Sequence, residues 1–133
     1  LTRMAGAGRV SAEAFSLYKA VREALEAGVA AVQPGQLATD VDKAARDVLE
    51  GHRLGSAFVH GTGHGLGLDV HEAPRVGPGN PAEAVRLESG MVVTIEPGAY
   101  VAGLGGVRLE DDVLVTAAGR EVLTTAPLDL LLV

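Results

Sequence analysis

Apolar residues recur at steps of three and four positions near the start of the chain. They are Phe15, Tyr18, Val21, Leu25 and Val29. This spacing predicts a helix with one buried face. Ser11 precedes the run as an N-cap residue, Glu13 lies in the first turn, where an acid favours the helix dipole, and Pro34-Gly35 ends the helix.

A second helix is predicted by the next apolar stripe, which consists of Val41, Ala44, Ala45, Val48 and Leu49. Thr39 stands in the N-cap position, and Asp42 follows three residues later, about where a capping box places its acid. Gly51 ends this helix. The acids Asp40, Asp42 and Asp47 are expected to face solvent, and none of them is expected to bind a metal.

Short apolar runs punctuated by glycine and proline replace the helical spacing after Gly55. "MVVTIEP" at 91–97 predicts a buried strand, and "GGVRLEDDVLVT" at 105–116 predicts one long strand with acids at its middle. "AAGR" at 117–120 predicts a turn, after which "EVLTT" at 121–125 returns. Two helices followed by such strands indicate an α+β domain in which helices pack on an antiparallel sheet.

The composition of the 133 residues narrows the classes of function. A formal net charge of −6 argues against nucleic acid or an anionic membrane as a partner. The chain has no cysteine, so any metal ion would be held by His, Asp or Glu. No apolar run reaches the length of a membrane span and no signal peptide is visible, which favours a cytoplasmic protein.

Two carboxylates occupy positions where the strand pattern calls for apolar residues. Glu96 follows "MVVTI", and Glu110 lies within "VRLEDDVLV". Burying a carboxylate is costly unless it is paired, hydrogen-bonded or bound to a cation. Strand alternation places Arg108, Glu110 and Asp112 on one face and Val107, Leu109 and Asp111 on the other. A structural ion pair between Arg108 and Glu110 is therefore one interpretation.

Three of the four histidines lie in "HGTGHGLGLDVHEAP" at 60–74, and they favour a different interpretation. A single histidine is usually structural, and His60 alone could be a hydrogen-bonded core residue. Three histidines, His60, His64 and His71, in a chain that also buries two strand carboxylates, indicate a metal site. One imidazole and two carboxylates suit Mn, Co, Fe or Zn in a hydrolytic role.

Three segments of the chain, taken together, resemble the C-terminal signature segments of the pita-bread metallopeptidases, a family that includes methionine aminopeptidase, aminopeptidase P and prolidase. The segments are "HGTGHGLGLDVHEAP", "GMVVTIEPGAY" and "GGVRLEDDVLVT", and the match extends over about residues 1 to 125. The resemblance implies the C-terminal half of the pita-bread fold. It also implies a site with two divalent metal ions (Mn, Co or Zn) in the intact enzyme.

The resemblance assigns roles to the metal ligands. His64, in "GHG", corresponds to the histidine ligand, and Glu96, in "TIEPG", corresponds to the second ligand. Glu110, in "RLED", corresponds to the third ligand, which bridges both metals. Glu96 would also carry a proton to the leaving amine.

The resemblance also assigns residues that act on the substrate. His60 corresponds to a histidine near the scissile region, and His71, in "DVHE", to the histidine that contacts the substrate carbonyl and stabilises the oxyanion. Arg108 corresponds to an arginine of the proline-specific branch. "LGGVRLEDD" and "GLDVHE" therefore favour hydrolysis of Xaa-Pro bonds, in dipeptides or at peptide N-termini. A methionine aminopeptidase and a non-catalytic binding module of the same fold are the alternatives.

The chain departs from the family pattern in its missing aspartates. The family uses five protein ligands, two of them aspartates upstream of the histidine, and "LTR" at 1–3 resembles the end of the segment that carries them. Because the first residue is Leu1, we expect residues 1–133 to be part of a catalytic domain. We expect this part alone to bind one metal ion or none and to be inactive. The intact protein is expected to be a homodimer that acts on proline-containing peptides.

Overall fold

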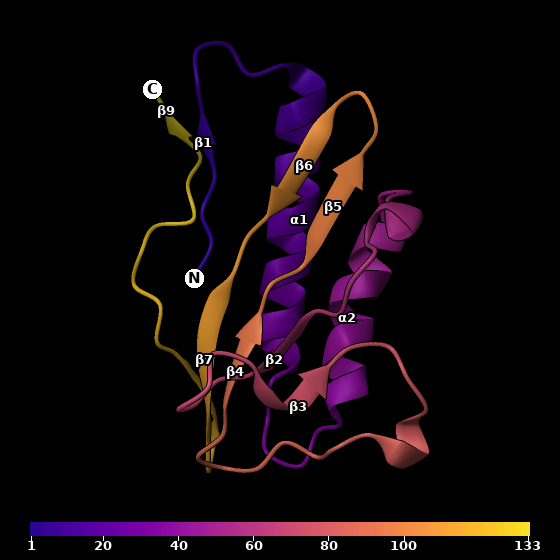
Figure 1. The fold of residues 1–133 in the computed structure, drawn as a ribbon, viewed down its shortest axis with the longest axis vertical. Coiled ribbons are helices and arrows are strands. Elements are labelled where there is room, and N and C mark those ends of the chain that lie inside the picture. Colours follow the sequence, from indigo (N-terminus) through magenta and orange to yellow (C-terminus); the bar gives the residue numbers. More distant parts are fainter.

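A computed structural model describes all residues of the chain, 1–133. Two long helices are followed by a series of short strands (Figure 1). The helices are α1 (Ala12–Ala31) and α2 (Ala38–Gly51), with short 3-10 turns at Gly55–Ala57 and Pro81–Glu83. The strands are β1 (Ala5–Gly6), β2 (Gly63–Gly65), β3 (Glu72–Val76), β4 (Val92–Ile95), β5 (Gly98–Val101), β6 (Gly105–Arg108), β7 (Asp111–Thr116), β8 (Gly119–Val122) and β9 (Leu131–Leu132).

The first helix begins as its sequence predicts. The Oγ atom of Ser11 accepts a hydrogen bond from the N–H of Ala14, which confirms Ser11 as the N-cap. Phe15 does not belong to the buried face, because its side chain is 46% exposed and stacks on Tyr18 at the edge of that face. The buried residues of α1 are Leu17, Tyr18, Ala20, Val21, Ala24, Leu25 and Gly28.

The second helix starts differently from the prediction. Leu37, not Thr39, is the N-cap residue, and no side chain caps this end. The reason lies in the backbone: the N–H of Ala38 already donates to the carbonyl of Val85, so the chain enters α2 from a strand-like pairing. The expectation that Asp42 faces solvent is also wrong, because its side chain is only 2% exposed.

Five strands form the central antiparallel sheet in the order β3-β2-β4-β7-β8. The register of β4 on β7 pairs Val93 with Val113 and Ile95 with Asp111. A separate hairpin, β5-β6, crosses in front of α1 (Figure 1). The parallel pair β1-β9 joins a segment near the N-terminus to one near the C-terminus. The helices and the antiparallel sheet confirm the α+β class.

The long strand predicted at 105–116 is divided in two. The sheet strand β7 and the hairpin strand β6 are separated at Leu109 and Glu110, just as β4 and β5 are separated at Glu96 and Pro97. Pro97 has no N–H with which to continue the strand pairing. The two neighbouring segments of the chain therefore leave the central sheet at the same level. The predicted alternation is confirmed, since Val107, Leu109 and Asp111 are buried. The returning strand is β8, which begins earlier than predicted.

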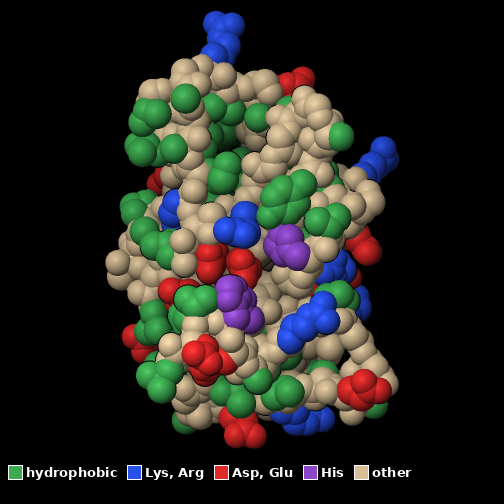
Figure 2. All heavy atoms as spheres, viewed as in Figure 1, with side chains coloured by type: hydrophobic (Ala, Val, Ile, Leu, Met, Phe, Trp, Pro, Cys, Tyr) green, Lys and Arg blue, Asp and Glu red, His purple; other side chains and the backbone are tan.

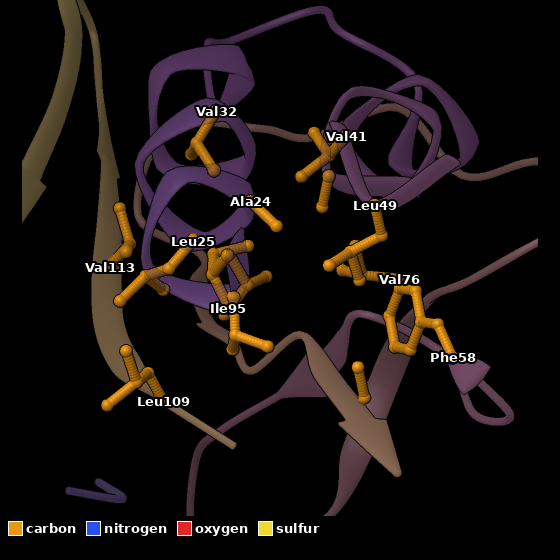
Figure 3. Packing of buried hydrophobic residues seen from close by; sticks show 14 of the residues in the cluster. Ala24, Leu25, Val32, Val41, Leu49, Phe58, Val76, Ile95, Leu109 and Val113 are labelled. Atoms are coloured by element: carbon orange, nitrogen blue, oxygen red, sulfur yellow. The ribbon is translucent and has the colours of Figure 1, made fainter. Parts of the chain in front are cut away.

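The apolar core lies between the two helices and the central sheet (Figure 3). Leu25 of α1 points toward Ile95 and Val113 of the sheet, and Leu49 of α2 lies beside Val76 of β3. All five side chains are at most 1% exposed. This packing fixes the strand ends that carry Glu96 and Glu110. No helix is both long enough and apolar enough to cross a membrane.

Candidate functional site

The predicted metal ligands come from three strands that are neighbours in the sheet. His64 is the middle residue of β2, Glu96 follows β4 and Glu110 precedes β7. The Nε2 atom of His64 lies 3.2 Å from the Oε1 atom of Glu96. All three side chains line one cleft of about 350 Å³. In Figure 2, histidine, acidic and basic side chains gather near the middle of one face of the molecule.

Close backbone approach places His64 in this cleft. A Cβ atom on Gly63 would lie 1.8 Å from the carbonyl oxygen of Thr94, so β2 and β4 can meet only with glycine there. The N–H of His64 then donates to the Oγ1 atom of Thr94, 3.1 Å away. Thr94 was not singled out from the sequence, although it is the one polar residue of the apolar run 91–95.

The ring of His64 is oriented as a metal ligand would be. Its Nδ1 atom lies 2.9 Å from the carbonyl oxygen of Gly65, and a carbonyl only accepts, so Nδ1 carries the proton. In the neutral ring, Nε2 is then an acceptor, and it faces the carboxylate of Glu96. Two acceptors at this distance need a cation or a proton between them. A backbone carbonyl on the other ring nitrogen is the usual partner of a metal-binding histidine.

Glu110 is held on the other side of the cleft, with its side chain 13% exposed. Thr2 donates to its carboxylate, and the amino group of Leu1 lies 3.3 Å from its Oε1 atom. Burial raises the pKa of Glu110, but the hydrogen bond from Thr2 and the positive charges of Leu1 and Arg108 outweigh burial, so its pKa lies below the ordinary value. Glu110 is therefore an anion at neutral pH.

Asp112 is a further acid in the cleft that the sequence did not single out as a ligand. Its Oδ1 atom is buried and has no hydrogen-bond partner. Strand alternation placed it on the face of Glu110, which is the signal that could have identified it. A carboxylate oxygen without a hydrogen bond, 3.9 Å from the amino group of Leu1 and beside two glutamates, is a favourable setting for a cation. As they stand, no three His, Asp or Glu side chains converge closely enough to form a metal site.

The structure brings two of the predicted substrate residues to the same cleft. The ring of His71 lies 4.3 Å from that of His64, measured between centroids. Arg108, at the end of β6, is 45% exposed, and its Nε atom lies 3.9 Å from the Oε2 atom of Glu96. The Arg108 ion pair is thus with Glu96 and not with Glu110. An exposed guanidinium at the cleft remains available to a substrate.

His60 does not line this cleft. It lies beside the cleft, between Phe58 and Tyr100, whose ring centroids are 5.1 and 5.6 Å from its own. Its Nδ1 atom lies 2.7 Å from the carbonyl of Gly61, so this nitrogen carries the proton. Its Nε2 atom therefore accepts from the hydroxyl of Tyr100, 3.1 Å away. Five of the six predicted residues thus share the cleft, and His60 is adjacent to them.

Known proteins resemble this chain over almost its whole length. The sequence profile described as metallopeptidase family M24 matches residues 1–117. A Xaa-Pro dipeptidase of Pyrococcus furiosus is 40% identical over 131 residues, which are 98% of this chain and 37% of that protein. A peptidase of Bacillus subtilis that is described as uncharacterized, YqhT, is 39% identical over 132 residues, or 99% of this chain and 36% of that protein.

Solved structures agree with the sequence comparison. A prolidase from Thermococcus sibiricus superimposes with a TM-score of 0.92 at 43% identity. The match covers 98% of this chain and 35% of the prolidase chain. A dipeptidase from Pyrococcus horikoshii has a TM-score of 0.92 at 45% identity, over 98% of this chain and 36% of its own. These superpositions confirm the expected pita-bread fold. The chain spans about a third of the length of the relatives that it matches.

Proposed function

Because the chain belongs to metallopeptidase family M24, a family of divalent metal-dependent peptidases, we propose that the complete protein hydrolyses Xaa-Pro peptide bonds, in dipeptides or at the N-termini of peptides. The observation that carries the proposal is the meeting of His64, Glu96 and Glu110 in one cleft, from three neighbouring strands. The exposed Arg108 at this cleft and the Xaa-Pro dipeptidases among the relatives support the proline-specific branch.

Two divalent ions, Mn, Co or Zn, are assigned to the complete enzyme, and this chain contributes His64, Glu96 and Glu110 as ligands. The donor types fit, since one imidazole nitrogen and hard carboxylate oxygens suit these ions. When bound, such ions make a water molecule nucleophilic at neutral pH and polarise a carbonyl group. The hydrogen bond from Thr2 and the positive charge of Arg108 favour the ionised form of Glu110, and a carboxylate must be ionised to bind a metal.

The other residues of the cleft act on the substrate. His71, beside His64, donates a hydrogen bond to the oxygen of the scissile carbonyl as negative charge develops on it. Glu96 would accept a proton from the attacking water and pass it to the nitrogen of the leaving amine, and Arg108 lies 3.9 Å from its carboxylate. Arg108 also hydrogen-bonds within the site, and His60 acts from beside the cleft near the scissile region.

Residues 1–133 are assigned as one part of the catalytic domain. This follows from the share of the relatives that the chain spans, about a third, and from the three ligands that it offers where the family uses five. The remaining part would contribute the two aspartates. On its own, this chain would bind one ion or none and would not turn over. The complete protein is proposed to be a cytoplasmic homodimer.

The test is hydrolysis by the complete protein, loaded in turn with Mn, Co or Zn. An Xaa-Pro dipeptide, a longer peptide with proline at its second position and a peptide that begins with Met-Ala are compared. We expect cleavage of an Xaa-Pro substrate and its loss in Glu110→Gln, while Glu121→Gln, an exposed change on β8, cleaves as before. Cleavage of the Met-Ala peptide alone would favour a methionine aminopeptidase. Absence of cleavage with every ion would favour a non-catalytic binding module.

A further inference from the structure

An ion pair on α2, between a buried Asp42 and a half-buried Arg46, lies next to the site and has no part in the proposed chemistry. The Asp42 side chain is 2% exposed, and its two oxygens accept from the Nε and Nη2 atoms of Arg46, each 3.0 Å away. The next such pair along α2, Lys43 with Asp47, is exposed at both ends. Removing the charge of Asp42 from water is costly, so contacts within the fold must offset this cost.

The pair holds the segment of backbone that carries His60. Arg46 donates to the carbonyl of Phe58 at 3.1 Å and to the carbonyl of His60 at 3.0 Å. Its guanidinium lies over the ring of Phe58, 4.2 Å from the centroid. Phe58 in turn meets the ring of His60 edge-on. The guanidinium therefore fixes both the main chain and one wall of the His60 environment.

Asp42 extends the connection toward the predicted ligands. Its Oδ1 atom accepts from the N–H of Thr62 at 3.1 Å and from the hydroxyl of Thr62 at 2.8 Å. Thr62 is fully buried, and its carbonyl accepts from the N–H of Glu96 at 2.6 Å. One carboxylate on α2 is thus linked through Thr62 to the backbone of Glu96 and, through Arg46, to that of His60.

We infer that Asp42 and Arg46 are positioning residues, which hold the segment 58–62 so that Glu96 keeps its place in the metal cleft and His60 its place beside it. The inference rests on the proposed function, since Glu96 is a ligand only in that proposal. A contribution to stability alone would not need four bonds directed at the one segment that precedes His64. Partners that orient metal ligands commonly change metal affinity or activity by about 10- to 100-fold when they are removed.

The experiment measures Co(II) binding by the complete protein, from the visible absorption of the bound ion. Thr62→Val removes the hydroxyl that donates to Asp42 and keeps the shape of the side chain. We expect it to raise the Kd for Co(II) by about tenfold, and we expect Thr62→Ser to restore the affinity. Asp42→Asn should weaken binding at least as much. Asp47→Asn, on the exposed face of the same helix, is the matched control and should leave the Kd unchanged.

A second measurement does not depend on the metal. The imidazole ¹⁵N chemical shifts of His60 in the metal-free protein report the protonated Nδ1 atom and its neighbours. We expect these shifts to change in Asp42→Asn and Thr62→Val and to stay constant in Asp47→Asn. If Asp42→Asn does not fold, the Thr62 pair of variants decides the matter.

The outcomes separate this inference from the proposed function. Unchanged Kd values and unchanged His60 shifts, with only a lower melting temperature, would overturn the positioning role. Failure of the unmodified protein to bind Co(II) would overturn the proposed metal site, while the His60 shifts would still decide whether Asp42 positions that residue. A changed Kd together with changed shifts in both Asp42→Asn and Thr62→Val supports the inference.

Discussion

The Nε2 atom of His64 and the Oε1 atom of Glu96 lie 3.2 Å apart, across the boundary between β2 and β4. The other ring nitrogen of His64 is already bonded to the carbonyl of Gly65, so the pair presents two acceptors to the cleft. Ligands of one ion act as a unit, and their contributions are not additive. The pair therefore predicts a specific pattern in a double-mutant cycle.

His64→Gln and Glu96→Gln should each lower Mn(II) affinity by at least about tenfold, on the scale of changes around metal sites. The double variant should bind only slightly worse than either single variant, because the first change already removes the shared ion. Isothermal titration calorimetry on the complete protein measures all four affinities. Additive losses would mean that the two residues do not hold the same ion.

The two helix starts predict opposite responses to similar changes. Ser11→Ala removes the cap of α1 and should lower the free energy of unfolding by about 1 kcal/mol. Thr39→Val should be neutral or slightly stabilising, because the hydroxyl of Thr39 is buried without a partner and caps nothing. Chemical denaturation of both variants checks the pair. A loss of stability in Thr39→Val as large as that in Ser11→Ala would contradict the observed start of α2.

Glu13 gives α1 a pH dependence in the acidic range. A hydrogen bond from its own backbone N–H, and to a smaller extent one from Ser11, holds the pKa of Glu13 below its ordinary value of 4.5. A carboxyl with a lowered pKa stabilises the fold fully above pH 4.5, and this contribution is lost as the pH falls through the lowered value. Ser11→Ala should move the pKa of Glu13 upward, as measured by ¹³C NMR titration of its carboxyl. An unchanged pKa would show that Ser11 does not contribute.

Two leucines provide a matched test of the core. Leu25 is 1% exposed, between α1 and the sheet, and Leu68 is fully exposed in the loop after β2. Leu25→Ala should cost about 2–5 kcal/mol of unfolding free energy, because it removes buried methyl groups and leaves a cavity. Leu68→Ala should cost almost nothing by the same denaturation measurement. A small loss of unfolding free energy in Leu25→Ala would contradict the position of Leu25 in the core.

The candidate ligands could be predicted from the sequence because each interrupts a pattern. Glu96 ends an apolar run and Glu110 lies inside another, and such positions are costly for an uncompensated charge. The position of His60 could not be predicted, since spacing along a glycine-rich segment does not say which rings face one cleft. The division of the predicted strand at Leu109 and Glu110 depends on Pro97, which follows β4, the neighbouring strand in the sheet.

The burial of Asp42 was the largest error about the fold, and the sequence did contain a signal for it. Ala38, Asp42, Ala45 and Leu49 follow the spacing of a buried helix face, and all four are buried. A polar residue in such a stripe is either paired or strained. The partners Arg46 and Thr62 were visible as residues, but only the fold shows that the segment 58–62 lies against α2.

His64, Glu96 and Glu110 are proposed to hold a divalent metal ion in one cleft. The most direct measurement is anomalous X-ray diffraction from crystals of the complete protein grown with Mn(II). We expect an anomalous peak within coordination distance, about 2.0–2.4 Å, of the His64 Nε2 atom and of oxygens of both glutamates. An anomalous peak elsewhere in the protein, with these three side chains bonded only to protein groups, would contradict it.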